Sequence, residues 1–524
     1  MKNKPYELYK VQHVKSLKEH IEYCAENYKD KPAIKYFVDK ELKEASFIQF
    51  KNDIDAFGMY LVSKGFKDAK IALVGSNSYE WIVTYFAVVN YGNVIVPVDR
   101  LLNNEDITDI FNRSGVSAVV HSNSFTDVVE SQENAVSIKI ENFEEYLEEG
   151  RKIIAEGKIK APEIDIEKMC TIIYTSGTTG KPKGVMLSHK SIMSDSVATC
   201  EYDYLKGGNL TMLPLHHTFA FTACVVCAHI WGVPVFLNRA IKKLMEDIKI
   251  AKPYHILAVP MMVEVIYKKI WDNAEKSGKA GALRALIKIN KALMAIGIDI
   301  RHILFKQIRD GFGGNLELIV SGGAPIEDKY VQGLVDLGFI FLNGYGISEC
   351  SPIVAVNRLK YWRIGSAGPV IPCCEVKIID GEICVKGDNV MLGYFDDEEA
   401  TKEAFTEDGW FKTGDLGYID DGGFLYITGR IKNLIILANG KNVSPEELES
   451  KILSVPNVIE VVVYEKDGMI EAQIYAENRD GIEANIKELN RDLPIYKKIQ
   501  KVTFRNTEFE KTTTKKILRS KINK

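Results

Sequence analysis

The sequence lacks an excess of charge of either sign. Its 67 Lys and Arg residues nearly balance its 71 Asp and Glu residues, and the formal net charge is −4 at pH 7. A chain with this balance has no overall attraction for nucleic acid or for an anionic membrane surface. We therefore expect no nucleic-acid partner. With 46% hydrophobic residues over 524 positions, the composition is that of a globular protein long enough for more than one domain.

Long apolar runs are absent as well. One segment with some membrane-like character, residues 221–237, is interrupted by His229, Gly232 and Pro234, whereas a membrane-spanning helix needs about 20 consecutive apolar residues. The segment therefore predicts a buried helix followed by a buried strand. The polar start, MKNKPYELYK, has no apolar stretch typical of a secretion signal. We expect a cytoplasmic protein without a transmembrane segment.

Cysteine is scarce, and its number, nine, is odd. This indicates free thiols in a reducing compartment rather than a disulfide framework. The pair Cys224-x-x-Cys227 has neither a second C-x-x-C partner nor a following His. We interpret it as two thiols in an apolar helix and not as a metal or haem site.

What the sequence does contain is an alternation of short apolar runs with longer amphipathic ones. Residues 70–99 read as a strand, a helix and a second strand. Further candidate buried strands are SAVVHS (117–122), VPVFLN (233–238), HILAVP (255–260), LELIVSGGAPI (316–326) and FIFLNGYG (339–346). This alternation predicts an α/β architecture with parallel sheets.

The pattern changes after residue 360. Short strands joined by Gly and Asp turns predict an antiparallel β-rich subdomain at about 361–430. The chain from 431 to 524 predicts a small α+β domain, so that residues 1–430 form the larger N-terminal domain. In the smaller part we expect a helix capped by Ser444, with Glu447 completing a capping box, a hairpin turning at Asp467-Gly468, and a second helix over 482–493.

The stretch YTSGTTGKPKGVMLSH, residues 174–189, has the character of a phosphate-binding loop. Its glycines expose backbone N–H groups, and its hydroxyls and lysines add donors and positive charge. It is not a Walker loop, because Pro182 takes the place of Ser or Thr and Thr175 takes the place of the first Gly. A buried strand before it and a helix after it predict a strand–loop–helix unit at the carboxyl edge of a sheet.

Six further motifs follow in a fixed order. They are LPLHHTFAF (213–221), SGGAPI (321–326), NGYGISE (343–349), GWFKTGD (409–415), GRIKNLIILANGKNVSPEELE (429–449) and TTTKKILR (512–519). Together with residues 174–189 they resemble the adenylate-forming (AMP-binding) superfamily, and most of all its long-chain fatty acyl-CoA synthetases. The resemblance covers nearly the whole chain. It implies a large N-terminal domain of parallel-sheet α/β subdomains with a small β-barrel, followed by a small mobile α+β domain.

The resemblance also implies a reaction. A carboxylate attacks the α-phosphate of ATP to give acyl-AMP and pyrophosphate, and a thiol then takes the acyl group. The residues that would hold the phosphates are Thr175, Ser176, Gly177, Thr178, Thr179, Gly180, Lys181 and Lys183. Those that would hold the nucleoside or close the site around it are Gly323, Ala324, Gly344, Tyr345, Gly346, Ser348, Asp415, Arg430 and Lys432. By the same resemblance Tyr345 faces the adenine, Asp415 and Arg430 bind the ribose, and Glu349 binds Mg²⁺.

Three catalytic positions are implied in the same way: Thr175, His217 and Lys516. His217 matches a position beside the reacting carboxylate, and Lys516 matches the lysine that bridges this carboxylate and the α-phosphate. Lys515 precedes it where the family frequently has Gly, so Lys515 is the alternative. Lys432 resembles the hinge of the mobile domain, and Gly440 resembles a position lining a tunnel for the pantetheine arm of the thiol.

The acid is expected to be a medium- to long-chain fatty acid. Residues 219–226, FAFTACVV, lack the Asp with which amino-acid-activating relatives pair an α-ammonium, and a buried ammonium without a counter-charge is costly. The same apolar helix and the amphipathic stretch 275–320 resemble long-chain enzymes. We expect coenzyme A as acceptor and leave a peripheral membrane contact open. The alternatives are an acyl-carrier-protein ligase, a ligase for another non-amino carboxylic acid, and a nucleotide-binding regulator without chemistry.

Overall fold

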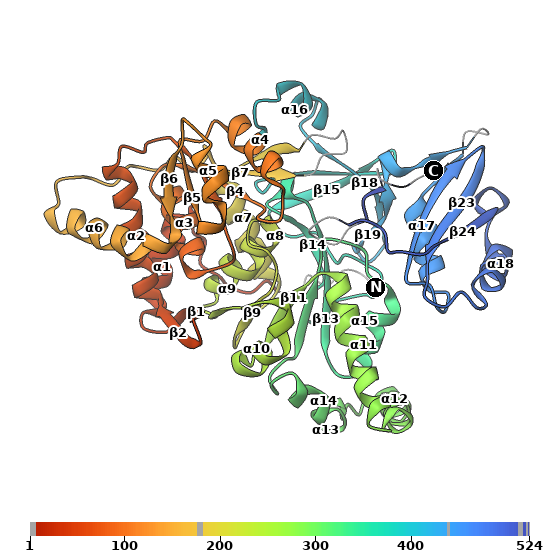
Figure 1. Cartoon of the computed structure of the whole chain (residues 1–524). Helices are drawn as coiled ribbons and strands as arrows, with labels where there is room; N and C mark the ends of the chain where they lie inside the picture. The colour runs from red at the N-terminus through yellow and green to blue at the C-terminus, as the bar shows by residue number, and fades with distance from the viewer. Residues whose placement is uncertain (1–6, 176–181, 438–440, 512–516, 520–521, 523–524) are drawn as a thin grey trace.

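A computed structural model describes residues 7–175, 182–437, 441–511, 517–519 and 522. Two large sheets form most of the molecule (Figure 1). The first has the strand order β17-β8-β7-β4-β3-β5-β6. Its strands are β3 (Lys70–Val74), β4 (Val94–Val98), β5 (Ala118–His121), β6 (Val136–Lys139), β7 (Met169–Thr175), β8 (Lys183–Ser188) and β17 (Gly393–Tyr394). From β7 to β6 the neighbours pair in parallel, as the sequence predicts.

The second large sheet has the order β14-β13-β12-β11-β9-β10-β1-β2. Its strands are β1 (Pro32–Val38), β2 (Glu41–Ser46), β9 (Asn209–Thr211), β10 (Val235–Leu237), β11 (His255–Ala258), β12 (Leu318–Ser321), β13 (Ile340–Gly346) and β14 (Ile353–Val356). The inner pairs from β13 to β1 are parallel, whereas the edge strands β14 and β2 are antiparallel. All five candidate strands named from the sequence are confirmed in these two sheets.

Helices cover both large sheets, which is why their strands are apolar on both faces. In β3, Ile71 and Leu73 join the core that lies between the two sheets, and Ala72 and Val74 join a second core on the opposite face. The helices of this part are α1 (Leu17–Tyr28), α2 (Phe47–Ser63), α3 (Tyr79–Asn90), α4 (Asn104–Ser114), α5 (Thr126–Glu130), α6 (Phe143–Glu156), α7 (His189–Tyr202), α8 (Thr218–Phe221), α9 (Cys227–Ile230), α10 (Leu244–Ala251), α11 (Pro260–Lys276), α12 (Ala280–Ala295), α13 (Arg301–Leu304), α14 (Lys306–Gly311), α15 (Asp328–Asp336) and α16 (Glu398–Ala404).

The β-rich part, expected as a small barrel, is a four-stranded antiparallel sheet. Its order is β15-β16-β18-β19, with β15 (Cys374–Ile379), β16 (Glu382–Gly387), β18 (Phe411–Ile419) and β19 (Leu425–Arg430). The chain beyond β19 forms a short ladder of β20 (Ile435–Ile436) and β21 (Asn442–Val443), and a sheet of β22 (Glu460–Lys466), β23 (Met469–Tyr475) and β24 (Lys501–Arg505).

This C-terminal part carries helices α17 (Pro445–Leu453) and α18 (Ile482–Asp492) and lies at the right of Figure 1. It has a core of its own, to which Val443, Leu448, Val463 and Ile486 belong. The predicted hairpin is confirmed, with Asp467 and Gly468 both at positive φ. The division at residue 430 stays a prediction.

The predicted helix after the 174–189 stretch is confirmed as α7, which begins at His189. The sequence did not predict the strand β8 before it, where residues 183–188 pair antiparallel with β7. The expected capping box of α17 was wrong in part. Ser444 does cap α17 by accepting from the Glu447 N–H, but the Glu447 carboxylate does not complete a capping box. It pairs instead with the Lys497 ammonium, 2.5 Å away.

The apolar segment 221–237 is confirmed as buried helical turns followed by β10. Cys224 and Cys227 are free and buried within it, so the interpretation as two core thiols is confirmed. Among the residues that the structure describes, every helix is too short or too polar to cross a bilayer.

Candidate active site

The two glycine-rich motifs at 321–326 and 343–349 meet at the carboxyl ends of neighbouring parallel strands. β12 ends at Ser321, which pairs with Asn343 of β13, so Gly323 and Ala324 leave the sheet beside Gly344 and Tyr345. Such an edge is where parallel α/β sheets bind ligands.

Gly346 shows why one of these glycines is required. A Cβ atom at this position would lie 2.0 Å from the Pro352 carbonyl oxygen. Any side chain would therefore force the antiparallel strands β13 and β14 apart, and the backbone around Tyr345 would move with them.

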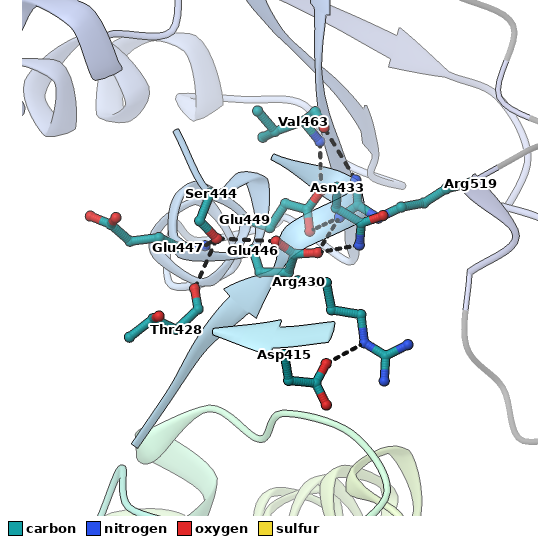
Figure 2. A network of polar contacts seen from close by, with 10 residues as sticks. All are labelled: Asp415, Thr428, Arg430, Asn433, Ser444, Glu446, Glu447, Glu449, Val463 and Arg519. Carbon is teal, nitrogen blue, oxygen red and sulfur yellow. Dashed lines mark hydrogen bonds and ion pairs between the residues drawn. The ribbon is translucent and has the colours of Figure 1, made fainter. Parts of the chain in front are cut away.

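Asp415 is buried between two of the predicted nucleotide-binding residues. The Tyr345 hydroxyl donates to Asp415 Oδ2 at 2.8 Å, and Arg430 Nε lies 2.7 Å from Asp415 Oδ1 (Figure 2). Asp415 and Arg430 are also register partners on β18 and β19. Burial and the neighbouring Asp415 raise the pKa of Tyr345 well above its usual value, so the phenol stays a donor. Three residues from three motifs thus form one connected group.

Glu349 lies in a short 3₁₀ turn, Ser348–Cys350, directly after β13. Its Oε1 accepts from the Tyr394 hydroxyl at 3.0 Å, and the Lys183 ammonium lies 4.7 Å from the centre of the Tyr394 ring. Thr175, eight residues before Lys183, donates its hydroxyl to the Lys183 carbonyl at 3.5 Å. Burial raises the pKa of Glu349. The structure therefore brings Glu349 and Lys183 to the same tyrosine.

His217 precedes α8, and its ring centre lies 4.1 Å from that of His216. The next residue, Thr218, donates to the Ser348 hydroxyl at 3.4 Å. This contact joins the motif at 213–221 to the motif at 343–349. His217, Ser348 and Glu349 consequently belong to one region of the molecule.

A largely apolar cavity opens beside Gly323, Tyr345 and Gly346. Its walls come from the helical segment after α8, from the strands β11 to β14, and from α7. Representative apolar lining residues are Phe219, Ala223, Leu257, Val320, Leu342 and Val356. The sequence predicts the contribution of the first segment but not that of α7.

Lys432 lies in the 3₁₀ turn Ile431–Asn433 that follows β19. Burial, with a smaller effect of Arg430, lowers the pKa of Lys432. Next to it, the Asn433 amide donates to Glu446 Oε1 at 2.5 Å, and the Ser444 hydroxyl donates to the Thr428 carbonyl at 2.8 Å. These contacts connect the turn to the start of α17 (Figure 2).

Arg519 connects the C-terminal motif to helix α17 as well. Its guanidinium pairs with Glu449 and lies 3.8 Å from Glu446 Oε1, and it also donates to the Val463 carbonyl on β22 (Figure 2). The last motif is thus attached to the C-terminal sheet and α17 through charged hydrogen bonds, which are stronger than neutral ones.

Some predicted site residues lie outside the described residues. They are Ser176, Gly177, Thr178, Thr179, Gly180, Lys181, Gly440, Lys515 and Lys516. Conversely, the sequence gave no reason to single out Tyr394. Only the pairing of its strand β17 with β8 brings it to Glu349 and Lys183, and a lone Tyr between Gly393 and Phe395 carries no signal of this contact.

Comparison with known proteins gives a consistent result. Residues 21–395 match the family model described as AMP-binding enzyme. The long-chain-fatty-acid–CoA ligase FadD15 of Mycobacterium bovis is 31% identical over 457 residues, which cover 81% of this chain and 76% of the relative. Human long-chain-fatty-acid–CoA ligase 1 is 29% identical over 486 residues, 81% of this chain and 68% of the relative.

A solved structure has the same fold. The o-succinylbenzoate coenzyme A synthetase MenE of Bacillus subtilis, in complex with ATP and a magnesium ion, superimposes with a TM-score of 0.76 at 24% identity, and the match covers 96% of this chain and 98% of the other. The family match spans well over half of the sequence, and the motifs at 213–221, 321–326 and 343–349 line one cavity. The chain therefore belongs to the AMP-binding enzyme family, the adenylate-forming enzymes.

Proposed function

We propose that this protein is an ATP-dependent acid–thiol ligase that activates a medium- to long-chain fatty acid as acyl-AMP and transfers the acyl group to coenzyme A. AMP and pyrophosphate are the other products. One observation carries the proposal: the large apolar cavity opens at Gly323, Tyr345 and Gly346, where the nucleotide-binding motifs meet. The names of the two relatives, both long-chain-fatty-acid–CoA ligases, support the same acid and acceptor.

In the proposed first step, the carboxylate needs no general base, because it is already ionised at neutral pH. The difficulty is that it must approach a second anion. Residues of this chain therefore have to supply donors and positive charge around the phosphates and hold the reactants in line. Lys183, with the loop before it, would screen the phosphates, and Lys516 would bridge the carboxylate and the α-phosphate. Tyr345, Asp415 and Arg430 would fix the nucleoside.

The residues present fit a magnesium ion. Glu349 is a buried carboxylate whose Oε1 is oriented by the Tyr394 hydroxyl, and the Lys183 ammonium lies over the ring of the same tyrosine. Within the described ranges, no group of three or more His, Cys, Asp or Glu side chains could hold a metal by itself. One carboxylate that completes its coordination with phosphate oxygens and water is an ordinary arrangement for Mg²⁺. When bound, the ion would neutralise charge on the phosphates.

The acid specificity is tested by ATP–pyrophosphate exchange with a panel of saturated acids from hexanoic to octadecanoic, together with benzoic and amino acids. We expect exchange with the fatty acids of medium and long chains, because an apolar cavity binds a hydrocarbon chain and leaves an ammonium or a second charge unpaired. Exchange confined to aromatic acids would contradict the fatty-acid assignment. Background exchange with every acid would favour a regulator that binds nucleotide without chemistry.

The acceptor is tested with purified acyl-AMP. We expect coenzyme A to be acylated at least about tenfold faster than a phosphopantetheinylated carrier protein, because the free thiol needs no protein docking surface. The reverse order would identify a carrier-protein ligase.

Gly440→Leu should slow the thiol step and leave adenylation unchanged. By resemblance Gly440 lines the passage for the pantetheine arm, and a leucine side chain would narrow it. We expect about a 100-fold slower formation of acyl-CoA from supplied acyl-AMP, with pyrophosphate exchange within about twofold of the original enzyme. Equal losses in both half-reactions would place the thiol passage elsewhere.

A further inference from the structure

The apolar cavity contains an unexpected polar pair at the end of α7. Thr199 lies on the last turn of the helix, Asp203 is the extended residue that follows its end, and both line the cavity. The Thr199 hydroxyl oxygen is buried without a hydrogen-bond partner among the described residues. A buried hydroxyl without a hydrogen-bond partner costs free energy of folding unless a ligand or a water molecule bonds to it.

Asp203 is a buried carboxyl group, 7% exposed, and its Oδ1 accepts from the Leu359 N–H at 2.8 Å. Like Thr199, it belongs to the cavity wall. The nearby Arg358 guanidinium donates to the carbonyls of Tyr202 and Glu7. The pair therefore places one hydroxyl and one carboxyl group in the wall of the same cavity.

This pair lies at the end of the cavity that is remote from the nucleotide motifs. Earlier on α7, Asp195 accepts from the Ile353 N–H at 3.0 Å, and Ile353 is the register partner of Gly346. From Asp195 to its end at Tyr202 the helix rises about 10 Å. Asp203 then contacts Leu359, which lies beyond the end of β14. An acyl chain whose carboxylate is held near Gly346 would extend toward Thr199 and Asp203.

We propose that Thr199 and Asp203 form a subsite for a hydroxyl group near the far end of the acyl chain, so that the protein prefers hydroxylated fatty acids to unsubstituted ones. The proposal rests on the proposed acid–thiol ligase function. A hydroxyl can donate to Asp203 Oδ2 and accept from the Thr199 hydroxyl, which satisfies both groups at once.

A neutral partner also fits the charge of this site. Burial raises the pKa of Asp203 to about 7, and the Leu359 N–H and Arg358 offset only part of this effect. Burial therefore disfavours the charged form of this carboxyl group, which makes it a poor counter-charge for a buried ammonium. A second carboxylate at the chain end would be repelled. Among simple polar groups, the hydroxyl is the one that this pair accommodates.

The test compares kcat/KM for ω-hydroxy acids and unsubstituted acids of equal length, from the octanoic to the hexadecanoic chain, in ATP–pyrophosphate exchange. We expect one or two hydroxylated lengths to be preferred about tenfold or more, because a site built for a hydroxyl leaves its groups unpaired with the plain chain. Equal kcat/KM at every length, or a preference for ω-amino acids, would overturn the proposal.

Thr199→Val is the decisive variant. It keeps the shape of the side chain and breaks no hydrogen bond among the residues that the structure describes. We expect about a tenfold lower kcat/KM for the preferred hydroxy acid and an unchanged or higher value for the plain acid. Asp203→Asn, which retains an oxygen for the Leu359 N–H, should act in the same direction.

Thr84→Val is the matched control. The Thr84 hydroxyl is likewise buried without a partner in the described part of the chain, but it belongs to α3 and does not line the cavity. In this variant the ratio of kcat/KM for the hydroxy acid to kcat/KM for the unsubstituted acid should not change. If Thr199→Val, like Thr84→Val, leaves this kcat/KM ratio unchanged, the hydroxyl subsite is refuted while the ligase function stands.

Failure of the ligase function is recognised separately. In that case no acid supports exchange, and the subsite is tested by the shift in Tm that each acid causes in the full-length protein without ATP. A larger shift with the hydroxy acid, lost in Thr199→Val, supports the subsite. Equal shifts with both acids, or none, overturn it.

Discussion

Lys516→Ala is expected to reduce ATP–pyrophosphate exchange about 100- to 1000-fold. This ammonium is proposed to neutralise charge that develops between the carboxylate and the α-phosphate, and removing one such donor from a reacting site typically costs this factor. Formation of acyl-CoA from supplied acyl-AMP should stay within about threefold of the original rate, because the phosphate chemistry is then already complete. The two half-reactions are measured separately, by isotope exchange and by thioester formation.

Lys515→Ala is the matched control for this result, since it removes the same charge one residue earlier. We expect exchange to fall by less than about fivefold, as for a cation that does not contact the reacting atoms. If Lys515→Ala greatly reduces ATP–pyrophosphate exchange and Lys516→Ala does not, Lys515 is the catalytic lysine instead of Lys516. If neither variant loses activity, the terminal lysines take no part in adenylation.

Ala223→Phe should shorten the range of acids that the enzyme accepts. Ala223 is 6% exposed and lines the apolar cavity from the helical segment Thr222–Val226. A phenyl ring there would occupy space that a long chain needs. We expect about a 100-fold lower kcat/KM for hexadecanoic acid and a nearly unchanged value for butanoic acid, because a filled pocket excludes the longer substrate by steric overlap.

Activity with butanoic acid is the internal control for correct folding of the variant. Ala285→Phe, on the exposed face of α12, is the control for adding a phenyl ring outside the cavity. Tm should fall by a few degrees at most if the ring enters the existing void. A parallel loss with butanoic acid would mean that the substitution disturbs the reacting end of the site. Full activity with hexadecanoic acid would mean that the chain binds outside this cavity.

Much of the fold could be predicted from local patterns. The buried strands β3, β4, β5 and β11 are short apolar runs bounded by polar or glycine-containing turns, and such runs leave few alternatives once helices separate them. Strand β8 could not be predicted in this way. Its six residues, KGVMLS, contain one β-branched side chain, and only the ladder with β7 makes them a strand.

The candidate site residues could be named from their motifs, but their arrangement in space could not. Glu349 and Lys183 stand in separate motifs, and nothing in either motif indicates that both contact Tyr394. Their meeting depends on the long-range pairing of Tyr394 with Val185. The polar end of the cavity was missed for a related reason. Thr199 belongs to a helix rich in Ser, Thr and Asp, and Asp203 directly follows it. This composition is typical of an exposed helix, but α7 is buried because it packs against the segment from Thr218 to Ile230, and also against α1 and β14.

The attachment of Arg519 limits how the terminal lysine can travel. Ile517 pairs with Lys511 in a β-bridge, and Arg519 is fastened to α17 and β22. Lys516 directly precedes Ile517 in the sequence, and consecutive Cα atoms are about 3.8 Å apart. We therefore expect that any movement of the C-terminal sheet and α17 would carry the proposed catalytic ammonium with it.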